Sequence, residues 1–209
     1  MCARPANPEL REKILKAASE IIEACGPDCV TMREVAEKIG YSPTTLYLYF
    51  RDKNAILQET VLNAFDSMNA ACEMVMVGPR AIDKFRQYCR AYVRWGVTHP
   101  GHYTLMFQVP LDVEWDSAWT EANIGRLTRG RIIAMQLLGE ALAEGDLREP
   151  TSLRAFNDAG WAALHGATSL SISRRLTVDI ADPNLEQVVA VATRTADVLV
   201  NCLIAGSGA

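Results

Sequence analysis

The 209-residue sequence lacks the segments that would take a protein into a membrane or an oxidising compartment. It has no run of about eighteen or more apolar residues, the length that spans a bilayer. Its N-terminus has no apolar stretch of the kind found in signal peptides. The six cysteines include no CxxC pair, which argues against a disulfide framework or a zinc site. We therefore expect a cytoplasmic protein with reduced thiols. We interpret Cys25 and Cys29, the only close pair, as ordinary buried thiols, and a thiol switch is the alternative.

Signatures of catalysis are missing as well. The chain contains no GxSxG or HExxH sequence, no phosphate-binding loop and no dinucleotide-binding loop. Neither His99 nor His102 has a nearby carboxylate or thiol at metal-ligand spacing, so we interpret both as loop residues around the break at His99-Pro100-Gly101. No metal, no cofactor and no enzymatic activity are predicted. The alternative is an all-helical enzyme, or a small-molecule-binding protein without a DNA function.

The apolar residues recur at helical spacing along most of the chain, and no segment alternates as a strand would. This pattern predicts an all-α protein of nine helices. Breaks at Gly78-Pro79 and at His99-Pro100-Gly101 separate neighbouring helices. The expected helices cover about residues 8–24, 31–39, 43–50, 52–76, 80–98, 102–109, 116–144, 151–173 and 184–204.

Two short helices joined by a tight turn are predicted between Thr31 and Lys53. The Thr31 hydroxyl caps the first helix, and Glu34 three residues later completes a capping box. Gly40 supplies the left-handed backbone that ends this helix. Ser42 and Pro43 then provide a cap and a proline at the first position of the next helix. This arrangement is typical of a helix-turn-helix.

The second of these helices has one inward face and one outward face. Leu46 and Phe50, four residues apart, are expected to face inward. Short polar side chains and Tyr47 then face outward, where a recognition helix meets base edges in the major groove.

The segment resembles the N-terminal domain of TetR-type transcriptional regulators. The resemblance covers about residues 9–57, and Leu46-Tyr47, Tyr49-Phe50 and Lys53 are its most specific residues. It implies phosphate or base contacts for Thr31, Arg33, Ser42, Pro43, Thr44, Thr45, Tyr47, Leu48, Tyr49 and Lys53. Thr44 stands where many relatives carry Gly and Tyr49 where many carry His. For Tyr49, packing beside Phe50 is the equal alternative.

The charge of the predicted DNA-binding segment is balanced. Residues 1–55 contain eight basic and eight acidic side chains, and the remaining chain carries 13 basic against 17 acidic. Such a segment depends on specific docking rather than on a broad basic surface. Arg4, Arg11, Lys13 and Lys16 are candidates for a small basic patch on the first helix or on the arm before it. We expect a DNA-binding domain over 1–55 and an effector-binding and dimerisation domain over 56–209.

The last two long helices carry wide stripes of apolar and small residues. Two such helices from each subunit would form a four-helix interface, the arrangement that the resemblance implies, and two-fold symmetry would require a palindromic operator. The alternative is that the stripes pack only within the monomer. The expected interface residues are Ala163, Ala167, Ile172, Val189, Ala192, Ala196 and Leu199.

A small-molecule pocket is expected in the second domain. Trp161, His165 and Gly166 resemble a Trp-His-Gly signature of one TetR-type subgroup. Aromatic and Met side chains supply an adaptable apolar lining, although for any single one of them core packing is the stronger alternative. The expected lining is Tyr92, Trp95, Met106, Phe107, Trp119, Met135, Trp161 and His165. We therefore predict a homodimeric repressor that binds double-stranded DNA at a palindromic operator. A small apolar effector would release the repressor from that DNA.

Overall fold

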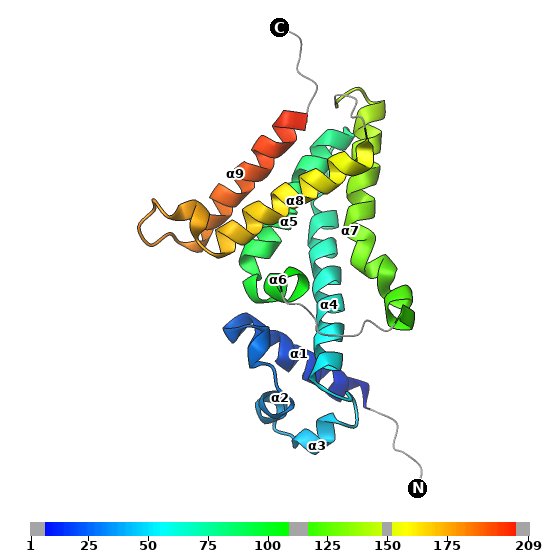
Figure 1. Cartoon of the computed structure of the whole chain (residues 1–209), viewed down its shortest axis with the longest axis vertical. Coiled ribbons are helices and arrows are strands. Elements are labelled where there is room, and N and C mark those ends of the chain that lie inside the picture. The colour runs from blue at the N-terminus through cyan, green and yellow to red at the C-terminus, as the bar shows by residue number, and fades with distance from the viewer. Residues whose placement is uncertain (1–6, 109–116, 148–151, 204–209) are drawn as a thin grey trace. The chain divides into compact units, whose positions relative to one another are not determined.

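The structure is a computed structural model that describes residues 7–108, 117–147 and 152–203 (Figure 1). This described part of the chain is all-helical and contains nine α-helices and two 3-10 turns, which confirms the predicted fold class. None of its helices is long and apolar enough to cross a membrane. The α-helices are α1 Pro8–Cys25, α2 Met32–Ile39, α3 Pro43–Leu46, α4 Lys53–Met74, α5 Ala81–Thr98, α6 Pro100–Phe107, α7 Ser117–Ala143, α8 Leu153–Ile172 and α9 Leu185–Leu203.

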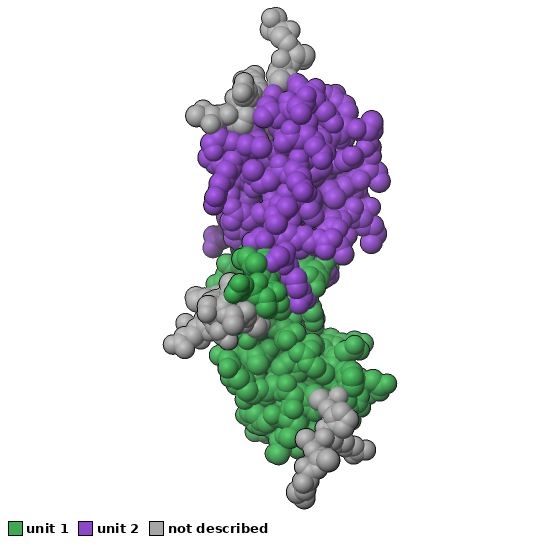
Figure 2. Space-filling model, turned by 90° about the vertical axis from the view of Figure 1, so that its right-hand side faces the viewer, with its two compact units in different colours: residues 1–66, 99–124 green, residues 67–98, 125–209 purple. Residues whose placement is uncertain are grey.

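The chain divides into two compact units, shown in Figure 2. Unit 1 consists of residues 1–66 and 99–124, and unit 2 of residues 67–98 and 125–209. This division differs from the expected boundary after residue 55, because the first part of α4 and all of α6 group with the N-terminal helices. The physical reason for the placement of α6 is its close packing on α1.

The contact between α1 and α6 requires glycine at position 101. A Cβ built there overlaps the carbonyl oxygen of Ile22 and lies 2.8 Å from its carbonyl carbon. The backbone N–H groups of Gly101 and His102 both donate to the Glu23 carboxylate, at 3.3 and 3.1 Å. Glu23 therefore caps the N-terminus of α6 from the side of α1.

His102 lies inside α6 and is buried, so the expected loop position is wrong. Its Nδ1 bonds the Glu23 carboxylate and its Nε2 lies 2.8 Å from the Ser19 hydroxyl. Burial raises the pKa of the Glu23 carboxyl, but the hydrogen bonds from His102 and Gly101 outweigh it and leave this pKa below its ordinary value. Sequence spacing missed this cluster because its members are about 80 residues apart.

Unit 2 is organised around α5, which packs against α8 and α9. Tyr92, Val93 and Trp95 of α5 are buried there. Arg90 of α5 also holds Asp197 of α9 through two hydrogen bonds of 2.6 and 2.8 Å. The guanidinium lowers the pKa of the Asp197 carboxyl against the opposing effect of burial.

The cysteines with described side chains form no disulfide with one another. Cys25 is exposed and Cys29 half-buried, so the expected burial of this pair is wrong. The pair lies where α1 ends and a 3-10 turn follows, and Cys29 Sγ–H donates to the Cys25 carbonyl at 3.2 Å.

Candidate nucleic-acid interface

The turn between α2 and α3 is fixed by local hydrogen bonds at both of its ends. The Thr31 hydroxyl accepts the Glu34 backbone N–H at 3.1 Å and donates to the Glu34 carboxylate, so Thr31 caps α2 as predicted. Gly40 ends α2 with a φ of 73°, in the left-handed region that favours glycine. The Tyr41 N–H then bonds the Ala36 carbonyl at 2.9 Å, which closes the end of the helix.

The second helix is shorter than expected, because α3 ends at Leu46. The Ser42 hydroxyl caps it by accepting the Thr45 N–H at 3.2 Å. Beyond it, the Phe50 N–H bonds the Leu46 carbonyl at 3.0 Å, so the chain keeps a helical turn. Leu46 and Phe50 are both buried, as predicted, and anchor the segment between them.

The other side chains of residues 43–48 are exposed or half-buried. Pro43 and Thr44 are exposed at the start of α3, and Thr45 is half-buried. Tyr47 is 55% exposed and Leu48 is 76% exposed. Burying Leu48 against another apolar group would remove substantial apolar area from water. An exposed leucine next to small hydroxyl side chains suits contact with thymine methyl groups.

Tyr49 has a partner inside the protein. Its ring is half-buried, and its hydroxyl accepts the backbone N–H of Asn7 at 3.2 Å. The hydroxyl thus links the start of α1 to the end of residues 43–50, which we call the recognition segment. This geometry favours the packing alternative for Tyr49.

Several cations of unit 1 are engaged in internal contacts. Arg11 bonds Glu59 at 2.8 Å and lies over the Phe50 ring, 5.0 Å from its centroid, so it is not available for the expected basic patch. Lys38 pairs with Glu20 at 3.0 Å. Four other cations of the described part of unit 1 are exposed and have no ion pair, namely Lys13, Lys16, Arg33 and Lys53.

Two features near this segment were not singled out in the sequence. Tyr41, directly after Gly40, is 45% exposed and adds an aromatic side chain to the turn. Asp52 caps α4 by accepting the Ala55 N–H at 2.9 Å, so Lys53 becomes the first residue of that helix. Both lie next to predicted helix ends, where an exposed aromatic residue and an Asp cap are recognisable signals.

The residues expected at a dimer interface divide into two groups. Ala163 is exposed, and Ile172 and Leu199 are half-buried. The other four pack inside unit 2, because α9 buries its apolar stripe against α5 and α8 of the same chain. For these four, burial within the single chain favours the within-monomer alternative. They are Ala167, Val189, Ala192 and Ala196.

The residues expected to line one effector pocket are dispersed. Tyr92 and Trp95 are buried on α5, where the Trp95 Nε1–H donates to the Ser67 hydroxyl at 3.3 Å. On α8, the rings of Trp161 and His165 lie 5.6 Å apart, and burial lowers the pKa of His165. Met106 and Phe107 are half-buried on α6 and belong to unit 1, and the side chain of Trp119 lies outside the described residues.

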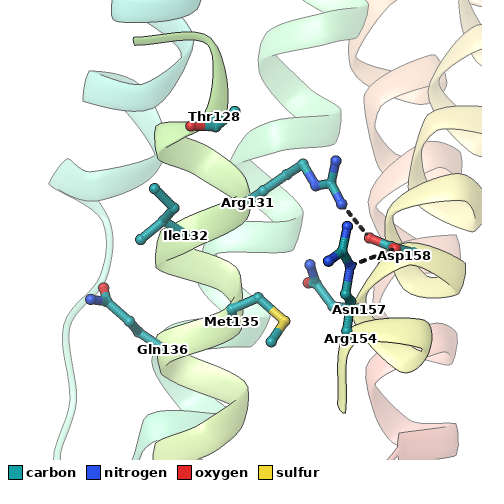
Figure 3. A pocket seen from close by; sticks show the side chains of 8 residues that line it. All are labelled: Thr128, Arg131, Ile132, Met135, Gln136, Arg154, Asn157 and Asp158. Carbon is teal, nitrogen blue, oxygen red and sulfur yellow. Dashed lines mark hydrogen bonds and ion pairs between the residues drawn. The ribbon is translucent and has the colours of Figure 1, made fainter. Parts of the chain in front are cut away.

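Of these residues, Met135 lines a described cavity, a groove of about 470 Å³ between α7 and α8 (Figure 3). Arg131 of α7 reaches across it to Asp158 of α8 at 2.6 Å, and Arg154 lies 4.0 Å from the same carboxylate. Sequence reasoning missed this cluster because Arg131 and Asp158 are 27 residues apart. The complete lining is Thr128, Arg131, Ile132, Met135, Gln136, Arg154, Asn157 and Asp158.

Two helices joined by a tight turn, the second followed by an exposed apolar and hydroxyl-bearing segment, define a helix-turn-helix DNA-binding regulator. Two family models match the chain. "Bacterial regulatory proteins, tetR family" matches residues 14–60, and "Tetracyclin repressor-like, C-terminal domain" matches residues 85–196, more than half of the chain. The chain belongs to the TetR family of DNA-binding transcriptional regulators.

Individual proteins show the same likeness. Tetracycline repressor protein class D of Escherichia coli is 25% identical over 188 residues, covering 77% of this chain and 86% of that protein. A solved structure of a protein of unknown function from Rhodococcus sp. RHA1 superposes with a TM-score of 0.77 at 24% identity, covering 97% of this chain and all of the other. The TetR family regulator PfmR from Thermus thermophilus gives a TM-score of 0.68 at 19% identity, covering 90% and 97%.

Proposed function

We propose that this regulator is a homodimeric repressor that binds a palindromic operator and is released by a small-molecule effector. The observation that carries the DNA side of the proposal is the exposure of Tyr47 and Leu48 directly after α3, on a base of buried Leu46 and Phe50. These two exposed side chains are adjacent and adjoin the hydroxyl groups of the helix cap, so one partner surface could cover them together.

The DNA contacts divide into phosphate and base contacts. Arg33 and Lys53, exposed at the starts of α2 and α4, are proposed to meet phosphates, with Thr31 and Ser42 beside them. Pro43, Thr44, Thr45, Tyr47 and Leu48 are proposed to lie nearest the bases. Tyr49 is proposed to position the segment through its bond to Asn7, with any phosphate contact secondary.

The dimer is proposed to form through α8 and α9. Ala159, Ala163 and Leu170 follow one another on an exposed face of α8, and Val198 is exposed on α9. Small residues let helices from two subunits approach closely, and a two-fold dimer presents one recognition segment to each half-site. Half-sites one helical turn apart require recognition segments about 34 Å apart.

Effector binding is proposed for unit 2, which contains the groove between α7 and α8. A cavity of about 470 Å³ falls within the roughly 300–1,000 Å³ that is usual for small-molecule sites. An effector can release DNA only if it binds the non-binding conformation more tightly than the DNA-binding one.

The family and individual residues support four further parts of the proposal, which are the subgroup, the location, the absence of an enzymatic reaction and the domain limits. Trp161, His165 and Gly166 support the Trp-His-Gly subgroup. A regulator of chromosomal genes acts where that DNA is, which supports a cytoplasmic location. We propose no enzymatic activity for the chain, because its named relatives are transcriptional regulators. We propose 1–55 as the part that contacts DNA and 56–209 as the part that binds effector and partner.

The DNA contacts can be tested by selecting fragments bound by the purified chain from a random DNA library. Tyr47→Ala and Leu48→Ala should each weaken binding of the selected fragment by about tenfold or more, the size expected for lost base contacts. Val178→Ala removes a highly exposed apolar side chain from unit 2 and serves as the matched control. The proposal would be contradicted if Tyr47→Ala and Leu48→Ala both bound the selected fragment as the wild type does. A monomer in analytical ultracentrifugation would contradict it as well.

A further inference from the structure

The groove between α7 and α8 contains an unequal number of charges. Arg131 and Arg154 both face the single carboxylate of Asp158, and these three are the only charged residues of its described lining. One guanidinium therefore has no counter-charge of its own in the groove. A second carboxylate placed between the two arginines would balance the site and form charge-assisted hydrogen bonds.

An amide side chain that lines the same groove makes no hydrogen bond within the described part of the chain. Asn157 is only 5% exposed, yet its side chain lines the groove and makes no hydrogen bond with any residue that the structure describes. In Figure 3 it lies beside Arg154, between the two helices. An amide that makes no hydrogen bond inside the protein can donate one to a ligand oxygen in the groove.

The rest of the lining determines the body of the ligand. Met135 points from α7 toward α8 in Figure 3, and Ile132 adds a second apolar side chain to the lining. A methionine side chain adapts to aliphatic or aromatic groups equally well. The site thus combines an anion-binding end with an adaptable apolar wall.

We propose that this groove binds a small carboxylate with an apolar body. The carboxylate would lie between Arg131 and Arg154 and accept a hydrogen bond from Asn157, while the apolar body packs on Met135. This inference rests on the proposed function for one point only, that the ligand is the effector that releases DNA. It narrows the expected small apolar effector to an amphipathic anion.

The first test compares matched ligands on the purified full chain at constant ionic strength. Octanoate and phenylbutyrate should raise the melting temperature, whereas octanol, phenylbutanol and octylamine at equal concentrations should raise it less or not at all. Equal shifts with acids and alcohols, or no shift with either acid, would overturn the proposal.

Variants of the charged residues should change octanoate affinity in opposite directions. A purely structural ion pair would not produce this pattern. Arg131→Gln should weaken octanoate binding by about tenfold, as expected for a lost hydrogen bond to a charged group. Asp158→Asn removes the competing carboxylate and should strengthen binding several-fold. Arg129→Gln is the control, because Arg129 lies on the same helix but pairs with Glu73 at 2.6 Å. Weaker binding in Asp158→Asn, or an equal loss in Arg129→Gln, would contradict the assignment.

The amide gives an independent check. Asn157→Leu keeps a similar volume but removes the polar group, so octanoate binding should fall several-fold while the free protein remains as stable or becomes more stable. A loss of stability without any change in octanoate affinity would show that Asn157 serves the fold alone and would overturn its role. A change from dimer to monomer in Arg131→Gln would instead make the groove an interface between copies of this chain, and would also overturn the proposal.

Failure of the effector role is distinguishable from failure of the DNA-binding proposal. If octanoate binds but leaves DNA binding unchanged at saturation, the effector assignment is wrong although the regulator binds its operator. If no DNA is selected at all, the repressor proposal fails, while calorimetric binding of octanoate still supports the groove as a carboxylate site.

Discussion

Replacing Gly101 with alanine tests the closest helix contact in unit 1. The new methyl group would overlap the Ile22 carbonyl oxygen and lie 3.0 Å from the Cα of Glu23. These are backbone atoms, so no change of side-chain rotamer relieves the overlap, and α6 has to move away from α1. Movement lengthens the bonds of 3.3 and 3.1 Å through which Gly101 and His102 donate to the Glu23 carboxylate.

The expected cost follows from two opposing effects. Overpacking costs about 1–3 kcal/mol, with the upper end appropriate for a rigid backbone neighbour. The higher helix propensity of alanine offsets at most about 1 kcal/mol. The net loss of about 2 kcal/mol corresponds to a fall in melting temperature of about 4–8 °C for a chain of this size.

Thermal unfolding followed by far-ultraviolet circular dichroism measures this fall. Gly125→Ala is the matched control, since a Cβ at Gly125 in α7 meets no atom within 4 Å and should raise the melting temperature slightly. The double variant with Glu23→Gln should lose less than the sum of the single losses, because both changes break the same bonds. A Gly101→Ala protein that melts at or above the wild-type temperature would refute the reasoning.

Three further predictions concern unit 1. Lys53→Ala should lower the slope of operator affinity against salt by about one phosphate contact, whereas Lys84→Ala in unit 2 should leave that slope unchanged. Tyr49→Phe keeps the ring but loses the bond to Asn7, so operator affinity should change less than threefold, and a loss of about tenfold would assign the hydroxyl to DNA. The pKa of the Glu23 carboxyl is lowered from 4.5, so its stabilising effect is complete above that value and is lost as pH falls through the folded pKa. Glu23→Gln should therefore differ from wild type in melting temperature near neutral pH and converge with it in acid, and a difference that persists in acid would contradict this account.

Local signals in the sequence were sufficient for the helix-turn-helix. Thr31, Gly40 and Ser42 act on backbone groups within a few residues, so their roles as caps and helix ends follow from spacing alone. The burial of Leu46 and Phe50 followed from helical periodicity in the same way. Only the length of α3 was overestimated.

Long-range contacts account for what the sequence did not reveal. The bond between Glu23 and His102, like the pair between Arg131 and Asp158, joins residues that only the folded chain brings together. The stripe of α9 shows a different limit. Periodicity identified Ala192 as part of an apolar face, but it cannot distinguish a face covered by the same chain from one covered by a second subunit.

Arg11 and Lys38 each form an ion pair with an acid of the same chain. These pairs affect how the regulator would be distributed between specific and nonspecific DNA. Nonspecific affinity depends on the number of phosphates that free cations neutralise, and a genome offers a vast excess of nonspecific sites. Each cation that is paired with an acid of the same chain contributes less to nonspecific binding, so these two pairs reduce the share of the regulator held on irrelevant DNA. Fewer molecules per cell would then be enough to keep a specific site occupied.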